Sequence, residues 1–133
     1  MNREIKFRAY QPEAKGDLKW WSWQELRESD LNTIFRHPER YHLMQYTGLK
    51  DKNGVEIYEG DICRAAVYKD PVALRKSMMI NSLVVFHDGA FILDGHKRLP
   101  DGFRTLPAFD DCEVIGNIHD NPELLEVLGD EDK

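Results

Sequence analysis

The sequence has few of the features that mark membrane or secreted proteins. None of its apolar runs approaches the roughly 20 residues that a membrane-spanning helix needs. The first residues alternate charged and apolar types and lack the core of a signal peptide. The only two cysteines, Cys63 and Cys112, lie in separate apolar stretches. We therefore expect a cytoplasmic protein without membrane contact, in which both cysteines are buried, reduced thiols.

Motifs for nucleophilic, phosphate-binding or dinucleotide-binding chemistry are also missing. The chain contains no G-x-S-x-G elbow, no G-x-x-x-x-G-K loop and no Rossmann glycine pattern. Its five histidines are scattered without the spacing of a zinc site, at His37, His42, His87, His96 and His119. We therefore expect no cofactor and no metal.

One stretch resembles the start of a calcium loop, but its spacing is wrong. In Asp51-x-Asn53-Gly54 the glycine comes fourth instead of sixth, and Ile62 stands where the loop needs a bidentate glutamate. A tight turn explains the stretch better, because Asn and Gly adopt positive φ at low cost.

Charge is distributed unevenly along the chain. The net charge is −6, yet residues 1–109 contain 17 basic and 15 acidic residues, whereas residues 110–133 contain nine acids and one lysine. Small basic groups occur at Arg75-Lys76 and His96-Lys97-Arg98. Neither forms the basic stripe that is typical of a nucleic-acid interface, so scattered solvated charge is the preferred interpretation.

Apolar alternation and turn residues predict a mainly β, antiparallel, barrel-like domain of the SH3/OB-like pseudobarrel type. An N-terminal hairpin is expected from residues 5–10 and 18–23, followed by one or two short helical turns within 23–36 that begin at Ser22 and Asp30. Pro122 and an Asn121 cap predict a helix over 121–128. Further strands are expected at 41–46, 62–68, 82–86, 90–93 and 112–118, with loops or helical excursions at 69–79 and 94–111.

The segment 46–62 concentrates the turn signals of the chain. We interpret it as a folding device that sets the strand register, with Gly48, Asn53, Gly54, Gly60 and Asp61 as turn residues. Asp61 is expected to accept hydrogen bonds from the neighbouring backbone and to fix a sharp bend before the next strand.

All three tryptophans, Trp20, Trp21 and Trp23, lie within four positions of each other. Core and edge packing is the simpler explanation, because aromatic residues favour strands. The alternative is an aromatic surface that binds a partner, since tryptophan is enriched at binding hot spots.

Several ordered motifs, spread over nearly the whole chain, resemble the YopX family, small proteins of bacteriophages and prophages. They are residues 3–9 (REIKFRA), 44–54 (MQYTGLKDKNG), 57–62 (IYEGDI), 113–118 (EVIGNI) and 121–124 (NPEL). The resemblance implies a mostly β, barrel-like fold over residues 1–128 and supplies no catalytic residue. Within it we expect a hairpin and helical segment over 1–40, a β-barrel core over 41–118, lineage-specific insertions at 69–79 and 94–111, and an acidic tail at 129–133.

Three functions follow, in order of preference. The first is a non-enzymatic accessory protein that binds a host or phage protein, or assembles with copies of itself. The second is a barrel that binds single-stranded nucleic acid, which combines aromatic faces with positive charge. The third is an enzyme whose site is assembled from Asp61, the histidines and Cys63 or Cys112.

Overall fold

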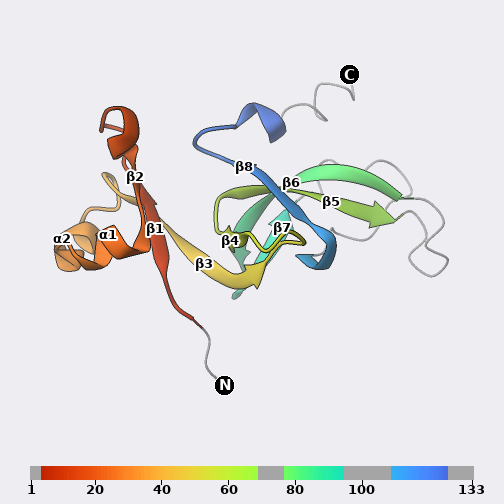
Figure 1. The fold of residues 1–133 in the computed structure, drawn as a ribbon, viewed down its shortest axis with the longest axis horizontal. Coiled ribbons are helices and arrows are strands. Elements are labelled where there is room, and N and C mark those ends of the chain that lie inside the picture. Colours follow the sequence, from red (N-terminus) through yellow and green to blue (C-terminus); the bar gives the residue numbers. More distant parts are fainter. Residues whose placement is uncertain (1–3, 69–76, 95–108, 126–133) are drawn as a thin grey trace.

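The computed structural model describes residues 4–68, 77–94 and 109–125, which form two four-stranded antiparallel sheets. The N-terminal sheet has the strand order β2 (Trp20–Trp21), β1 (Phe7–Tyr10), β3 (His42–Lys50), β4 (Glu56–Tyr58). The C-terminal sheet has the order β7 (Ala90–Asp94), β6 (Ser77–His87), β5 (Asp61–Tyr68), β8 (Glu113–Asn117). Figure 1 shows β3 running from the first sheet toward the second.

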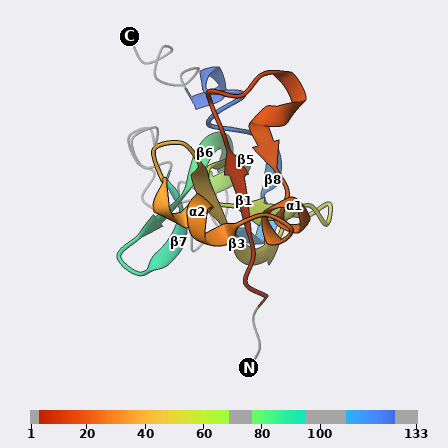
Figure 2. The ribbon, with the colours of Figure 1, turned by 90° about the vertical axis from the view of Figure 1, so that its left-hand side faces the viewer.

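Two short helices cover one face of the N-terminal sheet. They are α1 (Trp23–Arg27) and α2 (Leu31–Arg36), and Figure 2 shows both in front of β1 and β3. Ser22 and Glu25 form the predicted capping box of α1, and the Asp30 side chain accepts from the Thr33 N–H at the start of α2. Between helices and sheet lies a core of Ala9, Leu26 and Ile34, which Phe7, Trp21, Trp23, Leu31, Tyr41 and Leu43 partly cover.

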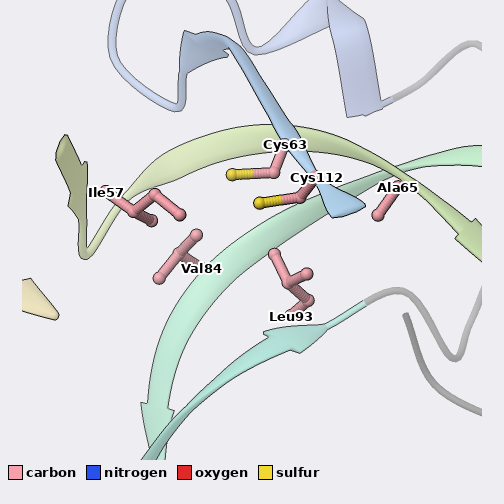
Figure 3. Close-up of a cluster of buried hydrophobic side chains, with 6 residues drawn as sticks. All are labelled: Ile57, Cys63, Ala65, Val84, Leu93 and Cys112. Atoms are coloured by element: carbon pink, nitrogen blue, oxygen red, sulfur yellow. The ribbon is translucent and has the colours of Figure 1, made fainter. Parts of the chain in front are cut away.

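The second core lies against the C-terminal sheet and contains both cysteines. Its fully buried members are Ile57, Cys63, Ala65, Val84, Leu93 and Cys112 (Figure 3). Both thiols are free, as predicted, and Figure 3 shows the two sulfur atoms side by side. Burial raises the pKa of both thiols, so they remain protonated and unreactive in the folded chain.

The turns between strands use the backbone angles that the sequence signals. The β6–β7 hairpin closes through a two-residue turn in which Asp88 and Gly89 have φ of 51° and 82°. Gly48, with φ of 89°, lies at an irregularity in the β3–β4 pairing. Gly60 turns the chain from β4 into β5 with φ of 87°, and a Cβ there would lie 2.9 Å from the sulfur of Met44. Only glycine fits this corner without strain.

The predicted antiparallel, mainly β class is confirmed, but over the described residues the strands form two sheets and no closed barrel. The described strands within 41–118, where the β-barrel core is predicted, are divided between the two sheets. The second strand of the N-terminal hairpin is also shorter than predicted, because a 3-10 helix takes Gly16–Lys19 and Ser22 already caps α1.

Other boundaries differ near the segments whose placement is not described. Residues 77–79 belong to β6, not to the predicted loop at 69–79, and Phe109–Asp111 forms a 3-10 helix. Residues 123–125 are helical, and the rest of the predicted C-terminal helix and tail lies outside the described residues. The Asn121 side chain accepts from the Asn117 N–H instead of capping that helix. Among the described helices, none is long and apolar enough to span a membrane.

Asp51 connects the turn after β3 to the first residues of β8. Its Oδ1 accepts from the N–H groups of Asn53 and Val55, at 2.8 and 2.9 Å, and its Oδ2 accepts from the Val114 N–H at 2.9 Å. Burial opposes ionisation, but these three N–H groups outweigh it and lower the pKa of Asp51 below its ordinary value of 3.8. The ionised carboxylate therefore stabilises the fold.

We predict that Asp51→Asn lowers the free energy of unfolding by about 2 kcal/mol at neutral pH, because the new amide group faces the Val114 N–H as a second donor. The stabilisation by Asp51 is fully present above pH 3.8, the ordinary pKa, and is lost as the pH falls through the lowered pKa of the folded state. Urea unfolding across this range measures both effects.

The matched control is Asp88→Asn, which changes an exposed turn residue that tolerates positive φ. Its unfolding free energy should stay within about 0.5 kcal/mol of the wild type. Equal urea midpoints for Asp51→Asn and the wild type at neutral pH would show that Asp51 does not hold this turn.

Candidate functional site

The two sheets are joined by a charged pair that is largely hidden from solvent. Arg8 on β1 donates from Nη2 to Oδ1 of Asp61 at 2.7 Å, and the two side chains are 20% and 3% exposed. The second carboxylate oxygen accepts from the Tyr58 N–H, also at 2.7 Å. Burial raises the pKa of Asp61, whereas the Arg8 charge and the Tyr58 N–H act in the opposite direction. Asp61 thus fixes its own bend and connects it to β1.

The Arg8 guanidinium lies over two aromatic rings. Its carbon lies 5.1 Å from the centre of the Trp20 ring and 4.8 Å from that of Tyr58. A guanidinium over an aromatic ring gains cation–π attraction in addition to its ion pair. Trp20 and Tyr58 are therefore held in fixed positions by the same residue that joins the sheets.

A second contact between the sheets involves the turn after β8. We call this contact, together with the Arg8–Asp61 pair, the joint between the sheets. The rings of Tyr10 and His119 stack at 4.2 Å with an interplanar angle of 13°, and Trp20 Nε1 donates to Oδ2 of Asp120 at 3.1 Å. His42 lies 5.2 Å from His119, measured between ring centres. Burial and then the neighbouring His42 lower the pKa of His119, so its ring is neutral at physiological pH.

Two of the three tryptophans form β2, and Trp23 is the first residue of α1. Trp20 packs on Tyr10 at the joint between the sheets, whereas Trp21 and Trp23 pack on the core beneath α1. Trp21 donates from Nε1 to Gln11 at 3.0 Å. All three are half-buried, so each contributes to packing and also keeps part of its ring at the surface.

Two hollows lie beside β2 and share Trp20, Trp21 and Glu25. We call them the tryptophan hollows. One has a volume of about 340 Å³ and is lined by Arg8, Trp20, Trp21, Ser22, Trp23, Glu25 and Tyr58. The other has a volume of about 360 Å³ and is lined by Gln11, Ala14, Leu18, Trp20, Trp21 and Glu25. Leu18 on its rim is 72% exposed.

Glu25 gives the tryptophan hollows a negative charge. Its Oε1 accepts from the Ser22 N–H at 2.9 Å, and this bond lowers the pKa of Glu25. No basic side chain forms an ion pair with Glu25 within the part of the chain that the structure describes. Of the described residues that line the hollows, Arg8 is the one cation, and it is already paired with Asp61.

The residues proposed for an assembled enzyme site lie in different places. Cys63 and Cys112 are fully buried in the second core, and Asp61 is bound to Arg8. His42 and His119 meet at the joint, and His96 lies outside the described residues. In the described ranges, no three His, Cys, Asp or Glu side chains come together as metal ligands.

The remaining turn residues act through the backbone. Gly54 has φ of 83°, and the Asn53 N–H donates to Asp51. Sequence reasoning missed the roles of Arg8, Asp51 and Glu25 at these sites. The capping box already placed Glu25 next to the tryptophans, so this residue could have been found, whereas the contacts of Arg8 and Asp51 join segments far apart in the chain.

Comparison with known proteins places the chain in a wider context. A family model described as YopX protein matches residues 5–126. Among solved structures, protein EF1440 from Enterococcus faecalis is 27% identical, and the match covers 94% of this chain and 100% of that one, with a TM-score of 0.51. No curated protein matches the chain.

The joint generates a second prediction. Arg8→Met should lower the free energy of unfolding by about 3 kcal/mol at neutral pH, because it leaves the Asp61 carboxylate buried and unpaired. The double variant Arg8→Met/Asp61→Asn should recover part of that loss. A carboxyl group whose folded pKa is raised destabilises the fold as the pH rises above its ordinary pKa, so the defect of Arg8→Met should shrink as the pH falls toward 3.8.

Lys6→Met is the matched control, because Lys6 directly precedes β1 and its partner Glu56 is 34% exposed. Its loss should stay below about 1 kcal/mol. If Arg8→Met and Lys6→Met lost the same stability, with no pH dependence for either, the Arg8–Asp61 pair would not hold the joint.

Proposed function

The chain belongs to the YopX family, and from this premise we propose that it is a non-enzymatic accessory protein of a bacteriophage or prophage. It acts in the host cytoplasm as a protein-binding or self-assembling module. The observation that carries this proposal is the pair of tryptophan hollows, which half-buried indole rings line together with the carboxylate of Glu25, a group without a basic partner in the described residues.

The hollows have the composition of a binding hot spot. Tryptophan contributes a large rigid surface at low entropic cost, and partly buried aromatic pockets dominate the energetics of many interfaces. The rings are held in place by Arg8, Gln11 and the α1 capping box, so little order has to be gained on binding. This supports a preformed site.

The charge of the hollows indicates what kind of group they accept. An ionised Glu25 beside indole faces favours a lysine or arginine side chain, whose stem packs on the rings while its cation reaches the carboxylate. We propose that such a basic side chain of a partner protein, or of a second copy of the chain, occupies a tryptophan hollow.

Single-stranded nucleic acid is the alternative occupant, since Trp20 and Tyr58 offer ring faces beside Arg8. Two observations weigh against it. Asp61 neutralises Arg8, and Glu25 would repel phosphate groups. Oligonucleotide binding measured at two salt concentrations tests this alternative, because real phosphate contacts weaken steeply as salt rises.

A displayed library of short random peptides, selected on the full chain, tests the preferred function. We predict that the binders are enriched in lysine and arginine and quench tryptophan fluorescence. Glu25→Gln keeps the hydrogen-bonding shape of the capping box but removes the charge, so it should weaken these peptides about tenfold.

Glu28→Gln is the control, because Glu28 is an exposed carboxylate that follows α1 and lies outside both hollows. It should leave the affinity unchanged. Binders without basic residues, or equal effects of the two variants, would reject the basic side chain as the occupant. A strictly monomeric chain that selects no peptide would reject the binding function itself.

A further inference from the structure

A third hollow lies where the two sheets separate, and strand edges line both of its sides. It has a volume of about 310 Å³ and is bounded by residues 42–44 of β3 and residues 83–86 of β6, with the corner at residues 59 and 60 between them. We call it the strand-edge groove. It shares no lining residue with the tryptophan hollows.

On the edge of β3 that faces the groove, some backbone groups have no strand opposite them among the described residues. The Tyr46 N–H donates to the Lys6 carbonyl at 2.9 Å, so in the antiparallel ladder alternate residues back to His42 direct their backbone groups toward β1. The backbone N–H and C=O groups of Gln45 and Leu43 point away from β1, to the edge of β3 that faces the groove. The Gln45 carbonyl accepts there from the Glu59 N–H at 2.9 Å. Leu43, beyond the corner, has no strand opposite it in the described part of the chain.

The edge of β6 repeats this arrangement. A two-residue turn joins β6 to β7, so the backbone N–H and C=O groups of His87 and Val85 point toward β7. Those of Val84 and Phe86 point to the other edge of β6, which faces the groove. The Val84 carbonyl accepts from the Gly60 N–H at 2.9 Å. β5 begins at Asp61, so among the described strands none lies opposite Phe86 on this side.

The two edges diverge from the corner at residues 59 and 60. β3 runs toward this corner and β6 runs away from it, so the two edges are antiparallel to each other. Figure 3 shows how strongly β6 curves. The groove is therefore the gap that keeps the two sheets from continuing into one another.

We propose that the strand-edge groove receives an extended segment of a partner protein by β-strand addition. The partial positive and negative charges of the N–H and C=O groups of Leu43 and Phe86 complement those of an extended backbone, which presents the same groups on both of its sides. An inserted strand would run antiparallel to one edge and parallel to the other. It would join the two sheets into one.

The lining of the groove supports this occupant over a helix. A helix satisfies its own backbone groups and would leave both edges unpaired. The Phe86 side chain is 55% exposed and packs against Phe91 at 5.0 Å, which provides an apolar anchor for a side chain of the inserted strand. His42 and His119 line the opposite part of the groove.

The test uses a displayed library of short random peptides and amide hydrogen exchange on the full chain. Peptides that bind the groove should slow the exchange of both the Leu43 and the Phe86 amides at least tenfold. Phe86→Pro removes the N–H that faces the groove and keeps the bonds of β6 to β7, so it should weaken these peptides about tenfold. Phe86→Leu, which keeps the N–H, should weaken them less. Glu25→Gln should leave them unaffected, which separates this site from the tryptophan hollows.

Hydrogen exchange of the wild-type chain keeps the test valid even if Phe86→Pro fails to fold. Fast exchange at Leu43 and Phe86 in the unliganded chain, with slow exchange at Met44 and Val85, is the expected pattern. Protection of Leu43 and Phe86 before any peptide is added would overturn the proposal, because the edges would already be paired within the chain or with a second copy. A library that yields no peptide protecting both amides would overturn it as well.

Discussion

The ion pair between Arg8 and Asp61 is the interaction on which the rest of the structure depends. It joins the first strand of one sheet to the first strand of the other, across 53 residues of sequence. The same carboxylate fixes the β4–β5 corner through the Tyr58 N–H, and the same guanidinium holds the rings of Trp20 and Tyr58. The relative position of the sheets, the sharp corner and the walls of a tryptophan hollow thus have a common origin.

This arrangement explains why a mainly β chain leaves its surface open in two ways. The ion pair with Asp61 neutralises Arg8. Among the described residues that line the hollow beside Arg8, Glu25 therefore has the one charge that is not paired. The corner at Gly60 forces β3 and β6 apart, so their edges do not meet over the described residues. The two proposed binding sites use these openings, one through side chains and the other through the backbone.

The sequence was sufficient for local features and insufficient for long-range contacts. The capping box at Ser22, the turn at Asp88-Gly89 and the bend at Asp61 depend on neighbouring residues, and short-range rules predicted all three correctly. The partner of Asp61, the third hydrogen bond of Asp51 and the adjacent sulfurs of the cysteines depend on how distant strands pair. The mainly β, antiparallel class was predicted correctly, but strand number and alternation do not reveal how the strands divide between two sheets at a glycine corner.

The central claim is that the joint holds the two sheets as one body. Residual dipolar couplings of backbone amides in β1 and β3, compared with those in β5 and β6, test it most directly, because they report the orientation of each sheet in solution. The account predicts that a single alignment tensor fits both sets of couplings for the wild-type chain. Two tensors of different orientation or magnitude would contradict it, since the sheets would then move independently despite the Arg8–Asp61 pair.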